Sequence, residues 1–241
     1  MQIRQFPDPE KLAMTTAEFI CNLAKDCIAD SGGFSLVLAG GSTPANTYRQ
    51  LVNTSQQLEL DWSSVQVYWG DERCVPPDHD QSNFRMAQRA LLDQVDIPEE
   101  NLQRMACEVD PDQGAESYEQ ILRDRFMDQA FPCFDLILLG LGEDGHTASL
   151  FPGADILEER QRWVAPVFVP HLESWRISLT LPAINAARHV AFLVSGEAKA
   201  ATLSKILETP TSNYPANRVA PQGELTWFID RAAGQLLKRV G

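Results

Sequence analysis

The 241-residue sequence predicts one α/β domain built on a mainly parallel sheet. Three observations carry this prediction. Segments with strand character alternate along the chain with segments of helical periodicity. Most of the strand segments, such as Leu136–Leu139, are continuously apolar, as strands buried on both faces of a sheet are. Glycine-rich loops follow several strands directly, where open parallel sheets place their binding sites.

Composition and charge exclude several classes of protein. With 44% hydrophobic and 22% charged residues, the chain resembles an ordinary soluble globular protein. No apolar run approaches the roughly 20 residues that a membrane helix needs, and residues 1–11 lack the apolar core of a secretion signal. The net charge of −13 argues against nucleic-acid binding, which needs a basic face. A small anionic substrate remains compatible with it if a few cations converge locally.

The cysteines predict free thiols rather than cross-links. Their number is odd, their spacing is scattered and no CxxC pair occurs, so neither a disulfide framework nor a zinc site is expected. We therefore expect reduced thiols and a cytoplasmic location. The five residues are Cys21, Cys27, Cys74, Cys107 and Cys133.

The first elements follow the α/β alternation. Residues 1–6 have the length of a short edge strand, which two nearby prolines end. From Pro9 onward, apolar residues recur every three or four positions until Gly32, which predicts a helix. Residues 34–39 are the next buried strand. This strand runs directly into the segment Gly-Gly-Ser-Thr-Pro at residues 40–44.

Residues 40–44 are typical of an anion cradle. Thr43 fits the N-cap of the following helix and Pro44 fits its first turn. A strand, a glycine turn and a helix N-terminus in succession expose free backbone N–H groups and the positive end of the helix dipole. The alternative is an ordinary turn between strand and helix that simply needs glycine.

The middle of the chain repeats this arrangement. Residues 63–69 predict a strand that ends in the loop Gly-Asp-Glu-Arg at residues 70–73, whose alternative is a salt-bridged surface loop. Ser82 and Asn83 cap a helix that extends to Leu92. A short strand at residues 101–105 and a helix at residues 111–130 follow.

The loop after Leu136–Leu139 is the centre of the predicted site. It reads GLGEDGH, and its three glycines allow tight or left-handed turns. It carries Asp144 and His146 just past the carboxyl end of a buried strand. Histidine is the natural proton-transfer group near neutral pH, and Asp144 can orient it or stabilise its cationic form.

The last third predicts further strands and helices. Residues 163–169 and 175–181 read as strands of an antiparallel hairpin, and residues 182–187 as a helical turn. A buried strand at residues 190–195 enters Ser-Gly-Glu-Ala-Lys and a helix that runs to about Leu207. Proline and asparagine make residues 210–221 a loop and a candidate lid. A final strand at residues 225–229 precedes a closing helix, residues 231–240, with Asp230 as its cap.

Parallel, neighbouring strands would bring these loops to one edge of the sheet. That edge would hold the helix N-terminus with Ser42 and Thr43, together with His146 and a set of cations; the cations are Arg73, Arg176 and Lys199. Such a cluster suits a phosphorylated metabolite. The alternatives are a solvated Lys199 and an Arg176 that pairs with Glu173. No GxSxG or HExxH motif occurs, which favours direct hydrolysis by an activated water.

Six motifs in order make the chain resemble a known family, the 6-phosphogluconolactonases of the glucosamine-6-phosphate isomerase/6-phosphogluconolactonase family. The resemblance covers nearly the whole chain. The motifs are LAGGSTP (residues 38–44), WGDER (69–73), SN (82–83), LLGLGEDGHTASLFPG (138–153), RISLTLPAIN (176–185) and SGEAK (195–199).

The resemblance implies a single domain, residues 1–241, with a three-layer α/β/α sandwich around a Rossmann-like sheet. It implies hydrolysis of 6-phospho-D-glucono-1,5-lactone to 6-phospho-D-gluconate, the second step of the oxidative pentose phosphate pathway, without a required metal or organic cofactor. The expected partner is thus a small phosphosugar lactone, and neither nucleic acid nor membrane is expected. The oligomeric state stays open and a monomer is compatible with the sequence.

Carried over by position, the resemblance makes His146 the base that activates the water, with Asp144 beside it. We expect Arg73 to stabilise the developing oxyanion. The expected substrate- and phosphate-binding residues are Gly41, Ser42, Thr43, Asp71, Arg73, Arg176 and Lys199.

Two other functions remain open. The first is a sugar-phosphate isomerase or deaminase. The deaminases resemble this loop but have glutamate just before the proline, where this chain has Phe151 before Pro152. The second is a non-catalytic sugar-phosphate-binding protein, against which the intact Asp144 and His146 pair speaks.

Overall fold

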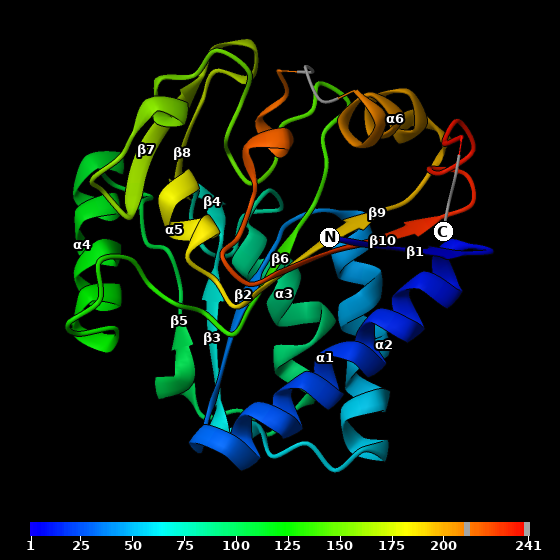
Figure 1. Cartoon of the computed structure of the whole chain (residues 1–241). Coiled ribbons are helices and arrows are strands. Elements are labelled where there is room, and N and C mark those ends of the chain that lie inside the picture. Colours follow the sequence, from blue (N-terminus) through cyan, green and yellow to red (C-terminus); the bar gives the residue numbers. More distant parts are fainter. Residues whose placement is uncertain (210–212, 239–241) are drawn as a thin grey trace.

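The computed structural model describes residues 1–209 and 213–238, without the side chain of His171. Its main sheet is parallel throughout, with the strand order β1-β10-β9-β6-β2-β3-β5 (Figure 1). The predicted parallel sheet and its edge strand β1 are therefore confirmed. The strands are β1 (Gln2–Phe6), β2 (Phe34–Leu38), β3 (Val65–Trp69), β5 (Leu102–Gln103), β6 (Leu136–Leu139), β9 (His189–Val194) and β10 (Glu224–Asp230).

A second sheet is small and antiparallel. Its order is β4 (Asp71–Arg73), β8 (Ser174–Leu179) and β7 (Val164–Val169). The predicted hairpin of β7 and β8 is confirmed. The expectation that residues 70–73 form a loop is wrong, because β4 pairs with β8 and their backbone groups satisfy one another. This pairing also sets Arg73 opposite Arg176.

Helices flank the sheets, as the predicted sandwich requires. α1 and α2 pack on each other, and α1 also contacts β2 and β10 of the main sheet; α4 packs against β7 and β8 (Figure 1). None of the helices in the described ranges is long and apolar enough to cross a membrane. The helices are α1 (Pro9–Ser31), α2 (Ser42–Gln57), α3 (Asn83–Ala90), α4 (Pro111–Arg125), α5 (Leu181–Asn185) and α6 (Ala200–Glu208).

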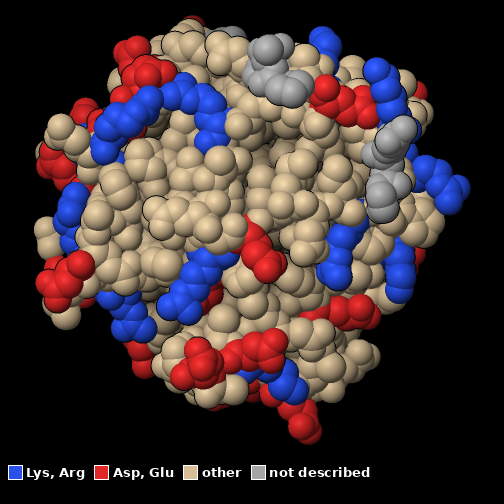
Figure 2. Space-filling view, in the orientation of Figure 1, with Lys and Arg blue, Asp and Glu red and all other residues tan. Residues whose placement is uncertain are grey.

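One hydrophobic cluster contains residues from both sheets. All four residues of β6 are buried, and Phe192 stacks on Trp227 with ring centroids 3.9 Å apart. The loops that leave β6 and β9 are therefore anchored in a well-packed interior. On the face seen in Figure 2, basic and acidic side chains are interspersed around a largely uncharged centre.

The closing helix predicted for residues 231–240 is wrong within its described part. Residues 231–236 form turns, and residues 239–240 lie outside the described ranges. Side chains of α6 form hydrogen bonds with the backbone of this segment. Ser204 Oγ donates to the Leu236 carbonyl, and the Lys238 N–H donates to a Glu208 carboxylate oxygen. A segment this short nucleates a helix poorly and follows such tertiary contacts instead.

The expectation that every cysteine is a free thiol is also wrong. Cys74 and Cys107 form a disulfide across 33 residues of sequence. Cys21, Cys27 and Cys133 are free. Cys74 directly follows Arg73, so the cross-link ties the end of β4 to the segment before α4. The two sulfurs meet only because the sheet brings these distant segments together, which scattered spacing does not reveal.

Candidate active site

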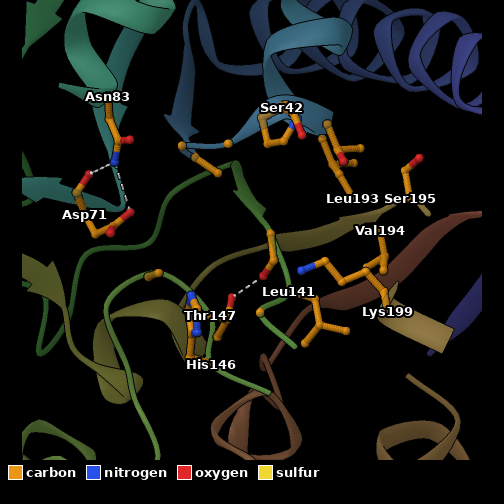
Figure 3. Close-up of a pocket in the computed structure, with 18 of the residues that line it drawn as sticks. Ser42, Asp71, Asn83, Leu141, His146, Thr147, Leu193, Val194, Ser195 and Lys199 are labelled. Atoms are coloured by element: carbon orange, nitrogen blue, oxygen red, sulfur yellow. Dashed lines mark hydrogen bonds between the residues drawn. The ribbon is translucent and has the colours of Figure 1, made fainter. Parts of the chain in front are cut away.

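A pocket of about 230 Å³ lies at the carboxyl ends of β2, β6 and β9, beside β4 and β8 of the small sheet (Figure 3). The parallel strands end at the same edge of the sheet, so the loops that follow them meet there. The pocket is lined by residues from these loops, among them Gly41, Ser42, Thr43, Asp71, Arg73, His146, Arg176 and Lys199. The structure thus brings these predicted residues together.

The N-terminus of α2 forms one wall of the pocket. The helix begins at Ser42 and its N-cap is Gly41, so the prediction of Thr43 as the N-cap is wrong by two positions. Gly41 has φ of 106°, a left-handed conformation that side chains disfavour. No side chain caps the helix. Pro44 has no N–H and the Ala45 N–H donates to the Gly41 carbonyl, so the N–H groups of Ser42 and Thr43 stay available to an anion.

His146 is held by the loop that carries it. Its Nδ1 lies 2.5 Å from Asp144 Oδ1, and its backbone N–H donates to the same oxygen at 3.2 Å. The Gly142 N–H in turn donates to the His146 carbonyl at 2.8 Å, which closes the loop. In the neutral imidazole, Nδ1 donates to Asp144, so Nε2 carries the lone pair that can accept a proton.

Asp144 is suited to balance a positive imidazole. Partial burial raises the pKa of its carboxyl group. The backbone N–H of His146, the charge of His146 and the hydrogen bond to its ring all lower that pKa, and together they outweigh burial, so the net shift is downward. The carboxylate is therefore ionised near neutral pH. Asp144 does not line the pocket itself; it lies behind His146.

Gly142 leaves room for this pair. A Cβ atom at this position would lie 2.2 Å from His146 Nδ1 and 2.6 Å from Asp144 Oδ1. Both distances are far below a normal contact, so any side chain would displace the imidazole or the carboxylate. The glycine of the motif is thus required by close packing against the pair.

Asp71 is the centre of a buried polar network on another side of the pocket. The Asn83 amide donates to its carbonyl at 2.8 Å and contacts its Oδ1 at 3.4 Å (Figure 3). Ser149 Oγ donates to its Oδ2 at 2.6 Å. Arg176 Nη1 lies 3.9 Å from Oδ2. Arg176 therefore faces Asp71, not Glu173 as the alternative had it.

Arg176 is a nearly buried cation, with 8% of its surface exposed. Desolvation lowers the pKa of its guanidinium and the charge of Arg73 adds to this, while Asp71 and Glu72 oppose it. Within the described part of the chain, the buried Nε atoms of Arg73 and Arg176 have no hydrogen-bond partner. Donors of this kind suit an anionic ligand.

Glu72 points away from the pocket and organises the segment beside it. Its carboxylate accepts from the backbone N–H groups of Arg73, Asn83 and Phe84 and from the Ser82 hydroxyl. Burial raises the pKa of Glu72, and these N–H donors counteract the rise. The carboxylate thereby binds the start of α3 to β4.

Lys199 reaches the pocket from a 3-10 turn, Glu197–Lys199, after β9. Its side chain is 26% exposed, and its Nζ lies 3.9 Å from an oxygen of the exposed Glu143. Lys199 is thus neither a fully solvated helix lysine nor a fixed ion pair. Its side chain is long and flexible, so its ammonium can reach an anion bound in the pocket.

Sequence reasoning did not name Asn83 and Ser149 as site residues. Asn83 lines the pocket, and Ser149 holds Asp71 from a position 78 residues away. Asn83 belongs to the motif at residues 82–83 and Ser149 to the motif at residues 138–153, and only this membership could have indicated their role from the sequence. Among residues 1–209 and 213–238, no group of three or more His, Cys, Asp or Glu side chains is arranged to hold a metal ion.

Comparison with known proteins agrees with this geometry. The family model described as "Glucosamine-6-phosphate isomerases/6-phosphogluconolactonase" matches residues 7–227. The 6-phosphogluconolactonase of Synechocystis sp. is 45% identical over 217 residues, which are 88% of each chain. The human 6-phosphogluconolactonase is 38% identical over 240 residues, which cover 98% of this chain and 93% of the relative.

Solved structures lead to the same family. The 6-phosphogluconolactonase from Trypanosoma cruzi superposes with a TM-score of 0.85 at 30% identity, over 99% of this chain and 97% of that one. A monomeric glucosamine-6-phosphate deaminase superposes with a TM-score of 0.83 at 23% identity, which shows the shared fold alone. The chain belongs to the glucosamine-6-phosphate isomerase/6-phosphogluconolactonase family.

Proposed function

We propose that this chain hydrolyses 6-phospho-D-glucono-1,5-lactone to 6-phospho-D-gluconate, the second step of the oxidative pentose phosphate pathway, with His146 as the base that activates water. The observation that carries the proposal is the pairing of His146 with Asp144 in a pocket that also holds a free helix N-terminus and three cationic side chains. The names of its relatives support the same activity.

The substrate's phosphate binds where positive groups converge. The N–H groups of the first turn of α2 and the ammonium of Lys199 would meet the phosphate oxygens, and Arg176 would add a third positive group. Anchoring the phosphate in this way brings the lactone carbonyl toward His146 without using the catalytic groups for binding.

The chemical step needs one proton carrier. Nε2 of His146 takes a proton from water while the water oxygen bonds to the lactone carbonyl carbon, and the carbonyl electron pair moves to its oxygen. Arg73, whose Nε has no partner within the described residues, stabilises that oxyanion. When the intermediate collapses, the bond to the ring oxygen breaks and His146 returns the proton to that oxygen. Asp144 stabilises the imidazolium in between.

A lactonase assay tests the proposal. Fresh lactone is generated by glucose-6-phosphate dehydrogenase, and the product is detected by 6-phosphogluconate dehydrogenase, above the spontaneous hydrolysis. We expect His146→Ala to lower kcat by about 10²- to 10⁴-fold, the usual contribution of a general base. His79→Ala is the matched control, because His79 is exposed and does not line the pocket. Full activity of His146→Ala would overturn the assignment.

The same assay separates the other functions. If the wild-type protein does not accelerate lactone hydrolysis, the lactonase function is rejected. Sugar-phosphate binding is then the next function to test, by calorimetry with 6-phosphogluconate. Ammonia release from glucosamine 6-phosphate would indicate a deaminase, which Phe151 disfavours because an apolar ring stands where the deaminases have a carboxylate. A single domain over residues 1–241 belongs to the proposal, and the shared hydrophobic cluster supports it. A cytoplasmic location belongs to it as well; the three free cysteines fit such a location, whereas the Cys74–Cys107 disulfide does not.

A further inference from the structure

Phe151 contacts the catalytic histidine from outside the pocket. Its ring centroid lies 4.3 Å from that of His146, with the ring planes inclined by 34°. Phe151 is 8% exposed and does not line the pocket, so it is placed to contact the imidazole rather than the substrate. Contact at this distance covers imidazole surface that the hydrogen bond to Asp144 leaves open.

The Asp144 hydrogen bond by itself restrains one atom of the imidazole, Nδ1. The ring can still tilt about that bond unless its other surfaces are packed. Gly142 approaches the Nδ1 and Cε1 side, where a Cβ would come within 2.3 Å of both atoms. Phe151 supplies the second packing contact, so hydrogen bond and packing together fix the direction of Nε2.

The Phe151 ring also contacts the buried cation of the site. The guanidinium carbon of Arg176 lies 5.4 Å from the ring centroid, a distance typical of a cation–π contact. One aromatic ring thus touches both the base and a phosphate-binding candidate. Arg176 has its own anchor in Asp71, whereas among the described residues the His146 ring is held by its hydrogen bond to Asp144 and by packing.

A second cavity lies on the far side of Phe151. This groove of about 690 Å³ is lined by Asp144 and Phe151 and by apolar residues of the β7–β8 hairpin, including Phe168 and Trp175. Phe151 lines this groove but not the catalytic pocket. Asp144 already lines this groove, whereas His146 does not. Truncating the Phe151 side chain would therefore open the His146 imidazole to water from the groove, and a more solvated hydrogen bond directs the ring less strictly.

We infer that Phe151 is a positioning residue of the lactonase reaction: its ring holds the His146 imidazole in the direction of the substrate and seals the base from the groove behind it. The inference rests on the proposed function, in which His146 is the base. It predicts a loss in the chemical step with little change in substrate binding, because Phe151 does not line the pocket in which the substrate would bind.

The experiment measures kcat and KM in the lactonase assay for wild type, Phe151→Leu and Phe151→Ala. We expect kcat to fall by about 3- to 10-fold in Phe151→Leu and by about 10- to 100-fold in Phe151→Ala, because misplacement of a reacting group by about 1 Å has effects of this order. KM should stay within about 3-fold of wild type. Partial rescue by leucine distinguishes graded packing from an all-or-none loss of structure.

Phe168→Ala is the matched control. It removes another aromatic side chain from the same groove, but Phe168 is 46% exposed and its ring packs at a tilt against Trp175 rather than against His146. It should keep the kcat of wild type. If Phe168→Ala lowers kcat as much as Phe151→Ala does, the groove as a whole supports activity and the inference is overturned.

The remaining outcomes are equally decisive. An unchanged kcat in a folded Phe151→Ala variant overturns the inference. A rise in KM without a change in kcat also overturns it, because the Phe151 ring would then act on phosphate binding through Arg176. If Phe151→Ala does not fold, Phe151→Leu decides, and a wild-type kcat there overturns the inference. An active wild type with an inactive His146→Ala keeps the proposed function in every one of these cases, whereas an inactive wild type rejects both.

Discussion

Arg176 and Lys199 bring positive charge to the same pocket in different ways. Arg176 lies on a strand of the small sheet, is 8% exposed and faces Asp71, which Ser149 and Asn83 hold in place. The Lys199 side chain follows a short 3-10 turn, is 26% exposed and has a partner, Glu143, that is 69% exposed. Asp71 and Lys199 lie on either side of His146 in Figure 3.

The difference follows from the cost of burying charge. A buried guanidinium loses its hydration, so it needs a fixed counterion before any substrate arrives. Asp71 supplies that counterion, and the Arg176 end of the pocket is therefore organised in advance. A half-solvated ammonium keeps much of its hydration and its side-chain freedom, both of which it gives up only when a phosphate binds. One end should thus affect folding, and the other should affect substrate binding.

Asp71→Ala should have the largest effect on stability. It leaves the buried Arg176 without its counterion and the Ser149 hydroxyl without its acceptor. We expect the free energy of unfolding to fall by about 3–5 kcal/mol, as when one partner of a buried ion pair is removed, measured by urea denaturation. Asp71→Asn keeps an acceptor for Ser149 and should fall between this variant and wild type. A loss below about 1 kcal/mol would mean that solvent already neutralises Arg176.

Loss of the Cys74–Cys107 disulfide should have the next largest effect, since it tethers the strand end that carries Arg73. The closed loop spans 33 residues, and a cross-link of this size stabilises by about 2–4 kcal/mol. Urea denaturation with and without dithiothreitol measures it. Cys74→Ser should match the reduced wild type and ignore the reductant, while Cys133→Ser should keep the full response. Equal sensitivity of Cys74→Ser to dithiothreitol would contradict the prediction.

Lys199→Ala should leave stability almost unchanged and act on binding. A charge-assisted hydrogen bond to phosphate contributes about 1.5–3 kcal/mol, so KM should rise by about 10- to 100-fold. The free energy of unfolding should stay within about 0.5 kcal/mol of wild type, as for most surface substitutions. Lys199→Arg, which keeps the charge, should recover part of the loss. An unchanged KM in Lys199→Ala would remove this residue from the phosphate site.

Local patterns were sufficient for most of the framework. The apolar run Leu136–Leu139 is a fully buried strand, and the β7–β8 hairpin and the helix after Pro9 form where the periodicity placed them. The meeting of the loops at one edge also followed from the pattern, since parallel strands leave no other place for them. The secondary structure of a segment can therefore be predicted where it depends on that segment's own residues.

The errors share a different cause. The start of α2 depends on the backbone angle of Gly41 rather than on the better capping side chain of Thr43. Residues 71–73 pair with a strand about a hundred residues further along, and the closing segment follows contacts with α6. In each case a distant partner or a single backbone angle outweighed the local preference, which is worth only about 1 kcal/mol or less per residue.

The sequence by itself determined the class of fold, the order of the elements and the identity of the histidine loop, because hydrophobic periodicity and glycine placement act over a few neighbouring residues. Only the tertiary structure decided which side chains support the site: Ser149 on Asp71, Cys74 on Cys107 and Phe151 against both His146 and Arg176. The Ser149 and Cys107 contacts join residues far apart in the chain, and all of them exist because the packing of the whole interior fixes where each segment ends.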